Sequence, residues 1–294
     1  MDENVLKKYI TAGKIAAEVK SDVLKIIKPG MKILDLAEFI EGELKKKGAK
    51  PAFPVNISIN EIAAHYTPSH DDTKIIQPGD LVKIDIGTQV DGYVGDMAFT
   101  YSSEKNPLIS AAEEVLESAI QILKPGITVG EIGKAIEEKA NSLGFGLIVN
   151  LTGHTLDKHV FHGTPSIPNV DNDSKYELKN DEVIAIEPFL VKTNGYVKES
   201  SPTEIYRYLQ DKSVRLPEAR KILQITRDDY EKFPFAKRWL HEFFSPVKIS
   251  MALRELERVS AIESYPVLKD MRIVPISQAE HTIIIQDNPI VTTR

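Results

Sequence analysis

The 294-residue chain contains no cysteine, which excludes disulfide bonds, thiolate metal ligands and a thiol nucleophile. It also lacks any apolar run that approaches the ~18 residues of a membrane-spanning helix. The first ten residues, MDENVLKKYI, are too highly charged for a signal peptide. We therefore expect a cytoplasmic protein without a membrane partner.

An excess of positive charge is absent as well. The chain has 37 Lys and Arg residues against 43 Asp and Glu residues, a net charge of −6. This balance does not favour a polyanion such as DNA as the partner, and we predict no nucleic-acid binding. The run Lys45–Lys47 is expected at the end of an exposed helix.

Several common catalytic motifs are also missing. The sequence has no G-x-S-x-G, no Walker A pattern, no H-E-x-x-H and no dinucleotide glycine fingerprint. Polar residues do, however, interrupt or border five apolar, strand-like runs. These residues are Asp85 in LVKIDIGT, Asp96 in YVGDMAFT, His154 in NLTGHTL, Glu187 in VIAIEPF and Glu280 in AEHTIII.

Carboxylates in such positions need compensation, because burying an unpaired charge is very costly. A shared cation would supply it, and a set of oxygen ligands with one imidazole suits hard or borderline divalent metals. The five residues therefore predict a buried metal centre, dinuclear, that activates water for hydrolysis. Spacing alone leaves open which of His154, His159 and His162 is the ligand.

Asp85 and Asp96 flank a predicted turn at Val90–Gly92. In a hairpin of that register they lie opposite each other or one diagonal step apart, on the same face. The other face is apolar, with Val82, Ile84 and Ile86 on one strand. The alternative is a surface hairpin with solvated aspartates, which these apolar neighbours disfavour.

The chain also contains an internal repeat. KPGMKILDLAEFIEGELKKKG begins at Lys28, and KPGITVGEIGKAIEEKANSLG begins at Lys124, an offset of 96 residues. A helical apolar pattern precedes each KPG, at roughly 5–27 and 108–123. We predict two related α+β halves, each with a helix, a Pro-Gly turn, a second helix that stops at glycine, and strands, with a site at the seam.

Beyond Gly195 the pattern changes. Pro217, Pro234 and Pro246 each open a helix-like segment, and proline is favourable at the first helical position. We predict a compact helical insertion at 204–264 between the segments of Glu187 and Glu280, and a catalytic domain formed by 1–203 and 265–294. Acidic and basic residues alternate in the insertion, so we favour a lid or pocket wall over a DNA-reading unit.

Taken together, FPVNISINEIAAHYTP, KIDIGTQVDGYVGDMAFT, LTGHTLDKHVFHG, AIEPF and AEHTIII resemble the methionine aminopeptidases over nearly the whole chain. The insertion, with KRWL and the SYPVL after it, resembles the type 2 subfamily in its archaeal form. Thr155 is a small departure, since relatives more often have Ser or Gly there.

The resemblance implies the pseudo-twofold pita-bread fold and removal of the initiator methionine from nascent chains, preferably before a small second residue. It implies two divalent ions (Co, Mn, Fe or Zn). The implied ligands are Asp85, Asp96, His154, Glu187 and Glu280, of which Asp85 and Glu280 bridge and Glu187 also acts as general base.

The same resemblance implies that His65, in AAHYTP, and His162, in VFHGTP, contact the scissile amide and its carbonyl. Phe53, Phe161 and Tyr265 would line the methionine pocket, which suits a flexible thioether. Read from the residues alone, a core or loop role is the more frequent one for a lone histidine, and core packing explains the three aromatic residues nearly as well. We expect a monomer that acts on peptide or nascent-chain N-termini, and access to nascent chains suggests a ribosome nearby.

Two alternatives remain open at this point. One is a proline-directed peptidase of the same fold (prolidase or aminopeptidase P), although such relatives carry an additional N-terminal domain and Val5 already begins the catalytic half. The other is a non-enzymatic binding protein of this fold, although such proteins typically lack ligands and here all five are present. The sequence assigns no role to His70, His159 or His281.

Overall fold

Two helix–turn–helix units form the outer layer of the protein, whose computed structural model describes residues 1–294. The first contains α1 (Glu3–Ile26) and α2 (Ile33–Lys46), and the second contains α3 (Pro107–Gln121) and α4 (Val129–Ser142). α2 and α4 begin 96 residues apart and end 96 residues apart, which confirms the predicted repeat. Gly30 and Gly126, with φ of 87° and 88°, make the equivalent turns, a conformation that glycine adopts readily.

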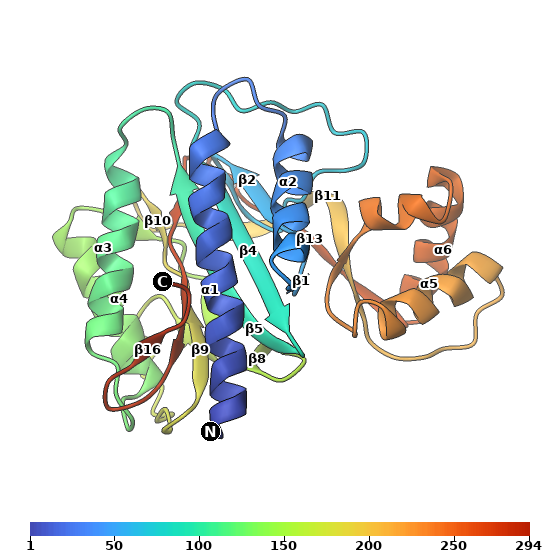
Figure 1. The fold of residues 1–294 in the computed structure, drawn as a ribbon. Helices are drawn as coiled ribbons and strands as arrows, with labels where there is room; N and C mark the ends of the chain where they lie inside the picture. The colour runs from blue at the N-terminus through green and yellow to red at the C-terminus, as the bar shows by residue number, and fades with distance from the viewer.

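The first half continues into an antiparallel sheet. Its strands are β1 (Lys50–Pro51), β2 (Asn56–Ile59), β4 (Val82–Val90) and β5 (Tyr93–Tyr101), in the order β1-β4-β2 with β5 paired to β4, and β3 (Ile62–Ala64) belongs to another sheet. One face of the β4–β5 pair is apolar, as predicted, and packs in one core with α1 and α2 (Figure 1). The opposite face looks toward the second half.

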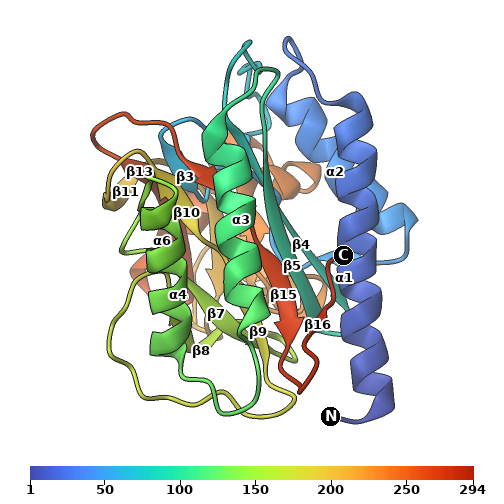
Figure 2. The same cartoon turned by 90° about the vertical axis from the view of Figure 1, so that its left-hand side faces the viewer.

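The second half holds a five-stranded sheet in the order β16-β15-β9-β7-β8. These strands are β7 (Thr152–Asp157), β8 (Val160–Pro168), β9 (Val183–Ile186), β15 (His281–Ile284) and β16 (Ile290–Val291). A small sheet, β14-β10-β6, joins β6 (Gly146–Leu147), β10 (Phe189–Val191) and β14 (Ser277–Gln278). α3 and α4 cover this half (Figure 2) and share its core. The predicted α+β architecture with two related halves is therefore confirmed.

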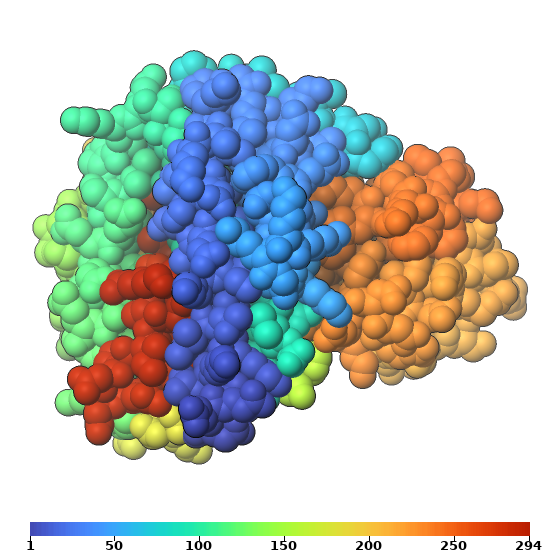
Figure 3. Space-filling model, in the orientation of Figure 1, coloured from blue at the N-terminus to red at the C-terminus, as the bar shows by residue number.

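Two long paired strands, β11 (Val197–Tyr208) and β13 (Ile262–Asp270), connect this body to the inserted residues. Between them lie α5 (Pro217–Asp228), β12 (Phe235–Ala236), a 3-10 helix η1 (Lys237–Glu242) and α6 (Pro246–Arg258). They form a lobe beside the body (Figure 3) with a core of their own. The domain limits at 204 and 265 fall within β11 and β13 and stay a prediction.

One predicted helix is wrong. The segment that opens at Pro234 begins as β12, whose Phe235 and Ala236 pair with Tyr206 and Ile205 of β11. Only six residues of 3-10 helix follow. Pairing with an available strand edge outweighs the local helical pattern here. No helix of the protein combines the length and apolar character needed to cross a membrane.

Candidate metal centre and active site

The hairpin of β4 and β5 places the two aspartates. Asp91 and Gly92 form its two-residue turn with positive φ at both positions, which matches the twist of the flanking strands. Asp85 pairs with Ala98, and Asp96 pairs with Gly87. The two carboxylates therefore lie one diagonal step apart on one face, as predicted. The surface-hairpin alternative is wrong, because Asp96 is only 2% exposed.

The second half brings its polar residues to the same place. His154 lies on β7, Glu187 directly follows β9, and Glu280 directly precedes β15. His154 Nε2 is 3.6 Å from Asp96 Oδ2 and 3.8 Å from Glu187 Oε1. Ligand atoms of Asp96, His154 and Glu280 all lie within 4.8 Å of one another. Side chains from both halves thus meet at the seam between them.

The four carboxylates are an unfavourable group when no cation is bound. Burial raises the pKa of Asp85 to about 8. Burial, and then the charges of the neighbouring carboxylates, raise the pKa values of Asp96 and Glu280 well above their usual range. Burial followed by the charge of Asp85 does the same to Glu187. Such shifts arise where like charges share a dry site.

The site meets the requirements of a divalent cation. Asp85 Oδ1 and Asp96 Oδ1 are buried and have no hydrogen-bond partner, which is costly unless another group satisfies them. The donor set of carboxylate oxygens with one imidazole nitrogen suits Mn, Fe, Co or Zn. Burial lowers the pKa of His154 to about 4, so its ring is neutral and able to bind a metal.

His65 and His162 lie beside this cluster, in the wall of the same cavity of about 290 Å³. Burial lowers the pKa of His65 to about 4, and its Nδ1 lies 3.2 Å from the carbonyl oxygen of Pro266. Its φ of 64° is unusual for a residue other than glycine, and such strain is often found at functional sites.

The His162 ring packs edge-on against that of His154, with the two ring centroids 4.7 Å apart. Its side chain is open to solvent in the cavity. Even so, desolvation by the surrounding protein, followed by the charges of His154 and His65, lowers its pKa well below the usual value.

Aromatic side chains form one wall of the cavity. The rings of Phe53 and Phe161 are 4.6 Å apart, and Tyr265 packs edge-on against His65 at 5.4 Å. Gly87, opposite Asp96, makes room for this wall, because a Cβ there would lie 2.1 Å from a ring carbon of Phe53. The three residues that the resemblance implied for a methionine pocket therefore line one cavity with the carboxylates.

The structure also places polar residues that the sequence did not predict. Gln278 is buried, and its Nε2 lies 3.4 Å from Glu280 Oε2 and 3.5 Å from Glu187 Oε2. Asn56 is paired with Asp85 across β2 and β4 and points an unpartnered Oδ1 into buried space. Their signal was the same as that of the ligands, a polar side chain in or beside a strand, but this signal is weaker for an uncharged amide.

The remaining histidines lie elsewhere. His159 is at the tip of the β7–β8 hairpin, where Nδ1 is 3.8 Å from a Glu231 oxygen. The rings of His70 and His241 stack at 3.6 Å, between the segment after β3 and η1. His281 Nδ1 is 2.7 Å from Thr293 Oγ1. Of the three candidates for the ligand, His154 is the one within reach of the carboxylates.

Comparison with known proteins first identifies the broad protein family to which this chain is related. Residues 7–219 match metallopeptidase family M24, which agrees with a two-half α+β fold that gathers carboxylates and one imidazole at its seam. Among solved structures, a thermophilic Arx1 superimposes with a TM-score of 0.84 at 22% identity, covering 99% of this chain and 91% of that one. The methionine aminopeptidase of Thermotoga maritima gives 0.73 at 24% identity over 100% and 98%. The prolidase of Pyrococcus furiosus gives 0.62 at 19% over 100% and 64%. These likenesses confirm the pita-bread fold.

Relatives that match over nearly their full length narrow the assignment from this broad family to one group of enzymes within it. The methionine aminopeptidase of Thermococcus onnurineus is 46% identical over 289 residues, which are 97% of each chain. That of Archaeoglobus fulgidus is 43% identical over 288 residues, 98% of this chain and 97% of the relative. The chain belongs to the methionine aminopeptidases of metallopeptidase family M24, and the predicted resemblance to the archaeal members is confirmed.

Proposed function

We propose that this protein is a metal-dependent methionyl aminopeptidase that removes the N-terminal methionine from peptides and nascent proteins, preferably when the second residue is small. The observation that carries the proposal is the convergence of four carboxylates and one imidazole, from both halves, on one cavity with an aromatic wall. Its full-length relatives bear the same activity in their names.

Asp85, Asp96, His154, Glu187 and Glu280 would hold two divalent ions. Two such ions, when bound, supply a nucleophilic water at neutral pH and polarise the carbonyl that it attacks. The unpartnered oxygens of Asp85 and Asp96 support this assignment. Co, Mn, Fe and Zn all suit the donor set.

Side chains of this chain would handle the protons. Glu187 would accept the proton of the attacking water as general base. The ring of His162 would donate a hydrogen bond to the carbonyl oxygen, on which negative charge develops. His65 donates from Nδ1 to Pro266 in its neutral form, which leaves Nε2 to accept a hydrogen bond from the scissile amide.

Phe53, Phe161 and Tyr265 would receive the methionine side chain, because a polarizable thioether packs well on aromatic rings. These rings line the same cavity of about 290 Å³ as the carboxylates, which would place the bound side chain next to the metal ligands. The free amino terminus would approach the acidic cluster, which accounts for cleavage at the terminal residue alone.

The finer parts of the prediction belong to the same proposal. We infer a monomer that acts in the cytoplasm, where nascent N-termini emerge, and that meets them close to the ribosome. We also infer a catalytic domain of residues 1–203 and 265–294 and an inserted subdomain of residues 204–264. The wall that Ile205 and Pro234 add to the cavity supports a role for that insertion in shaping the site.

Peptide cleavage tests the proposal directly. The Mn²⁺-loaded or Co²⁺-loaded protein is incubated with a Met-Gly-Ser peptide and, in parallel, with an X-Pro peptide of equal length. We expect release of methionine from the first and little product from the second. Cleavage of only the X-Pro peptide would instead establish a proline-directed peptidase, and no cleavage with no divalent-ion binding would establish a non-enzymatic relative.

A further inference from the structure

Lys83 is a buried lysine near the start of β4, and only 1% of its surface is exposed. Lysine is almost never buried without compensating partners. No carboxylate lies within ion-pair distance of its amine. Lys83 Nζ instead donates to the main-chain carbonyl oxygens of Asn60 and Ile276, each at 3.0 Å.

Burial lowers the pKa of Lys83 to about 7, and Glu61 and Asp80 act in the opposite direction. Carbonyl oxygens can accept a hydrogen bond from the ammonium and from the neutral amine alike, so both contacts persist through that titration.

The two acceptors belong to chain segments that lead into the site. Asn60 lies in the tight turn between β2 and β3, with φ of 51°, and His65 follows just beyond β3. Ile276 immediately precedes β14, and Glu280 comes four residues after it. Lys83 itself is two residues before Asp85 and shares its face of the strand, because side chains alternate along a strand.

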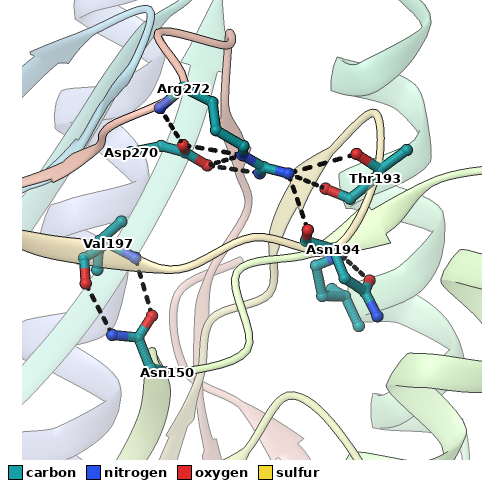
Figure 4. Close-up of polar contacts among 7 residues, drawn as sticks. Asn150, Thr193, Asn194, Val197, Asp270 and Arg272 are labelled. Atoms are coloured by element: carbon teal, nitrogen blue, oxygen red, sulfur yellow. Dashed lines mark hydrogen bonds and ion pairs between the residues drawn. The ribbon is translucent and has the colours of Figure 1, made fainter.

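The segment between β13 and β14, residues 271–276, is held at its other end by a different group. Arg272 forms an ion pair with the buried carboxylate of Asp270 and donates from Nη1 to the carbonyl oxygen of Asn194 at 2.8 Å (Figure 4). In the same view, Asn150 forms two hydrogen bonds with the main chain of Val197. The start of the segment is therefore fixed to the β10–β11 loop, and Lys83 fixes its end.

Further buried polar residues lie next to Lys83. Thr100, which is paired with Lys83 across β4 and β5, accepts from Gln278 N at 2.9 Å and donates to Gln278 O at 2.8 Å. Gln278 in turn lies within 3.5 Å of the Glu187 and Glu280 carboxylates. A row of buried polar groups thus connects the strand of Asp85 to the segment of Glu280.

We propose that Lys83 is a positioning residue for the metal centre, whose amine holds the segment of Glu280 and the turn before His65 in register with Asp85. This inference rests on the proposed ligand set. Partners that orient metal ligands typically change metal affinity or activity by about 10–100-fold when they are removed.

The test compares Lys83→Met, which keeps most of the volume and loses the donor, with the wild-type protein. Calorimetric titration of the metal-free proteins with Mn²⁺ measures affinity, and amide hydrogen exchange measures the opening of residues 274–280. We expect about tenfold or greater loss of Mn²⁺ affinity and faster exchange of that segment. Turnover of the Met-Gly-Ser peptide should fall through kcat, while KM stays close to its wild-type value.

Thr88→Val is the matched control. Thr88 lies on the same strand, is fully buried, and its hydroxyl contacts the carbonyl oxygens of Ala12 and Gly95, but it faces the helices. It should lose stability without losing Mn²⁺ affinity. If Lys83→Met retains wild-type Mn²⁺ affinity and segment exchange at a stability loss like that of Thr88→Val, Lys83 only supports the fold and the inference is wrong.

Chemical rescue provides a second readout. Lys83→Ala leaves space for a small amine, and we expect added methylammonium to restore part of the Mn²⁺ affinity to this variant and none to Glu280→Ala. Equal behaviour of the two variants would contradict the inference.

Should Lys83→Met not fold, Lys83→Gln, which retains a shorter donor, is measured in its place under the same criteria. Failure of the wild-type protein to bind Mn²⁺ would instead overturn the proposed function.

Discussion

Glu187 has two tasks in the proposed site, as a ligand and as the general base. Glu187→Gln keeps the size and polarity of the side chain but removes its ability to accept a proton. We expect kcat for a Met-Gly-Ser peptide to fall by roughly 10²–10⁴-fold, the usual contribution of a general base. The variant should unfold at nearly the wild-type temperature, which thermal melting followed by circular dichroism would establish.

Because Glu187 is also a proposed ligand, metal content needs its own control. Both proteins are stripped of metal, reloaded with Mn²⁺ and assayed at equal occupancy. Near-wild-type turnover by the reloaded Glu187→Gln protein would contradict the assignment of the base.

His65 combines a proposed catalytic role with a strained backbone. We expect His65→Ala to lower kcat by about 10²-fold or more, because the contact with the scissile amide is lost. At a φ of 64° glycine is less strained than alanine, so His65→Gly should be equally inactive yet more stable than His65→Ala. Steady-state kinetics and denaturant unfolding of both variants check this pair of expectations. If both variants fail to fold, the interpretation of His65 as a core residue is correct.

Some residues of the site were easier to predict from the sequence than others. Asp85, Asp96, Glu187 and Glu280 were recognisable because a carboxylate in an apolar run has few structural explanations. Gln278 and Asn56 were not, because an amide is cheaper to bury and occurs in many loops. Lys83 stood in LVKIDIG two residues before Asp85, and the same reasoning could have singled it out.

At the scale of elements, one buried ion pair anchors the inserted lobe to the body. Arg238 of η1 forms an ion pair with Glu41 of α2, and Trp239 Nε1 donates to the second oxygen of that carboxylate at 2.9 Å. Both charged residues are less than 10% exposed. Glu41→Leu leaves a buried guanidinium without its counter-charge, so we expect about 3–5 kcal/mol of destabilisation in denaturant unfolding.

An exposed pair of the lobe provides the comparison. Lys248 and Glu218 are 2.8 Å apart, with the lysine side chain 60% exposed. Lys248→Ala should cost about 1 kcal/mol or less. The double variant Glu41→Leu/Arg238→Leu should recover part of the loss, because no charge is then left unpaired. A cost for Glu41→Leu as small as that for Lys248→Ala would show that the pair does not anchor the lobe.

The helices and strands differ in how well the local sequence pattern predicts them. The helices of the two repeats were predictable, because Pro-Gly turns and glycine stops bound an apolar periodicity that the structure retains. The segment after Pro234 was not, because Phe235 and Ala236 pair with a strand that is distant in sequence, and Arg238 and Trp239 bind a carboxylate of α2. Local pattern carries no information about such partners.

For the molecule as a whole, the acidic cluster couples stability to pH and to metal. In the metal-free protein the pKa of Asp85 is raised to about 8, and those of Asp96, Glu187 and Glu280 are raised well above their usual range. Below about pH 6.5 the lowered pKa values of the buried histidines of the site act in the opposite direction. Between roughly pH 6.5 and pH 8 these histidines are neutral in both states, and the folded state binds more protons than the unfolded state. Unfolding free energy falls with rising pH wherever that holds. The metal-free protein should therefore lose stability as pH rises through this window.

Divalent ions reverse this coupling, because they bind the ionised carboxylates and displace their protons. The stability gained from saturating Mn²⁺ should therefore increase from pH 5 to pH 8, because the ion has fewer protons to displace as the pH rises. Melting temperatures of the metal-free and Mn²⁺-saturated protein, measured at several pH values in buffers of one ionic strength, give this difference directly. Asp96→Asn, which removes one of the clustered charges, should flatten the pH dependence of the metal-free protein. A metal-free protein whose melting temperature rises across the window in step with the Mn²⁺-saturated form would mean that these carboxylates are already ionised without metal, and the expected displacement of protons by the ion would then be wrong.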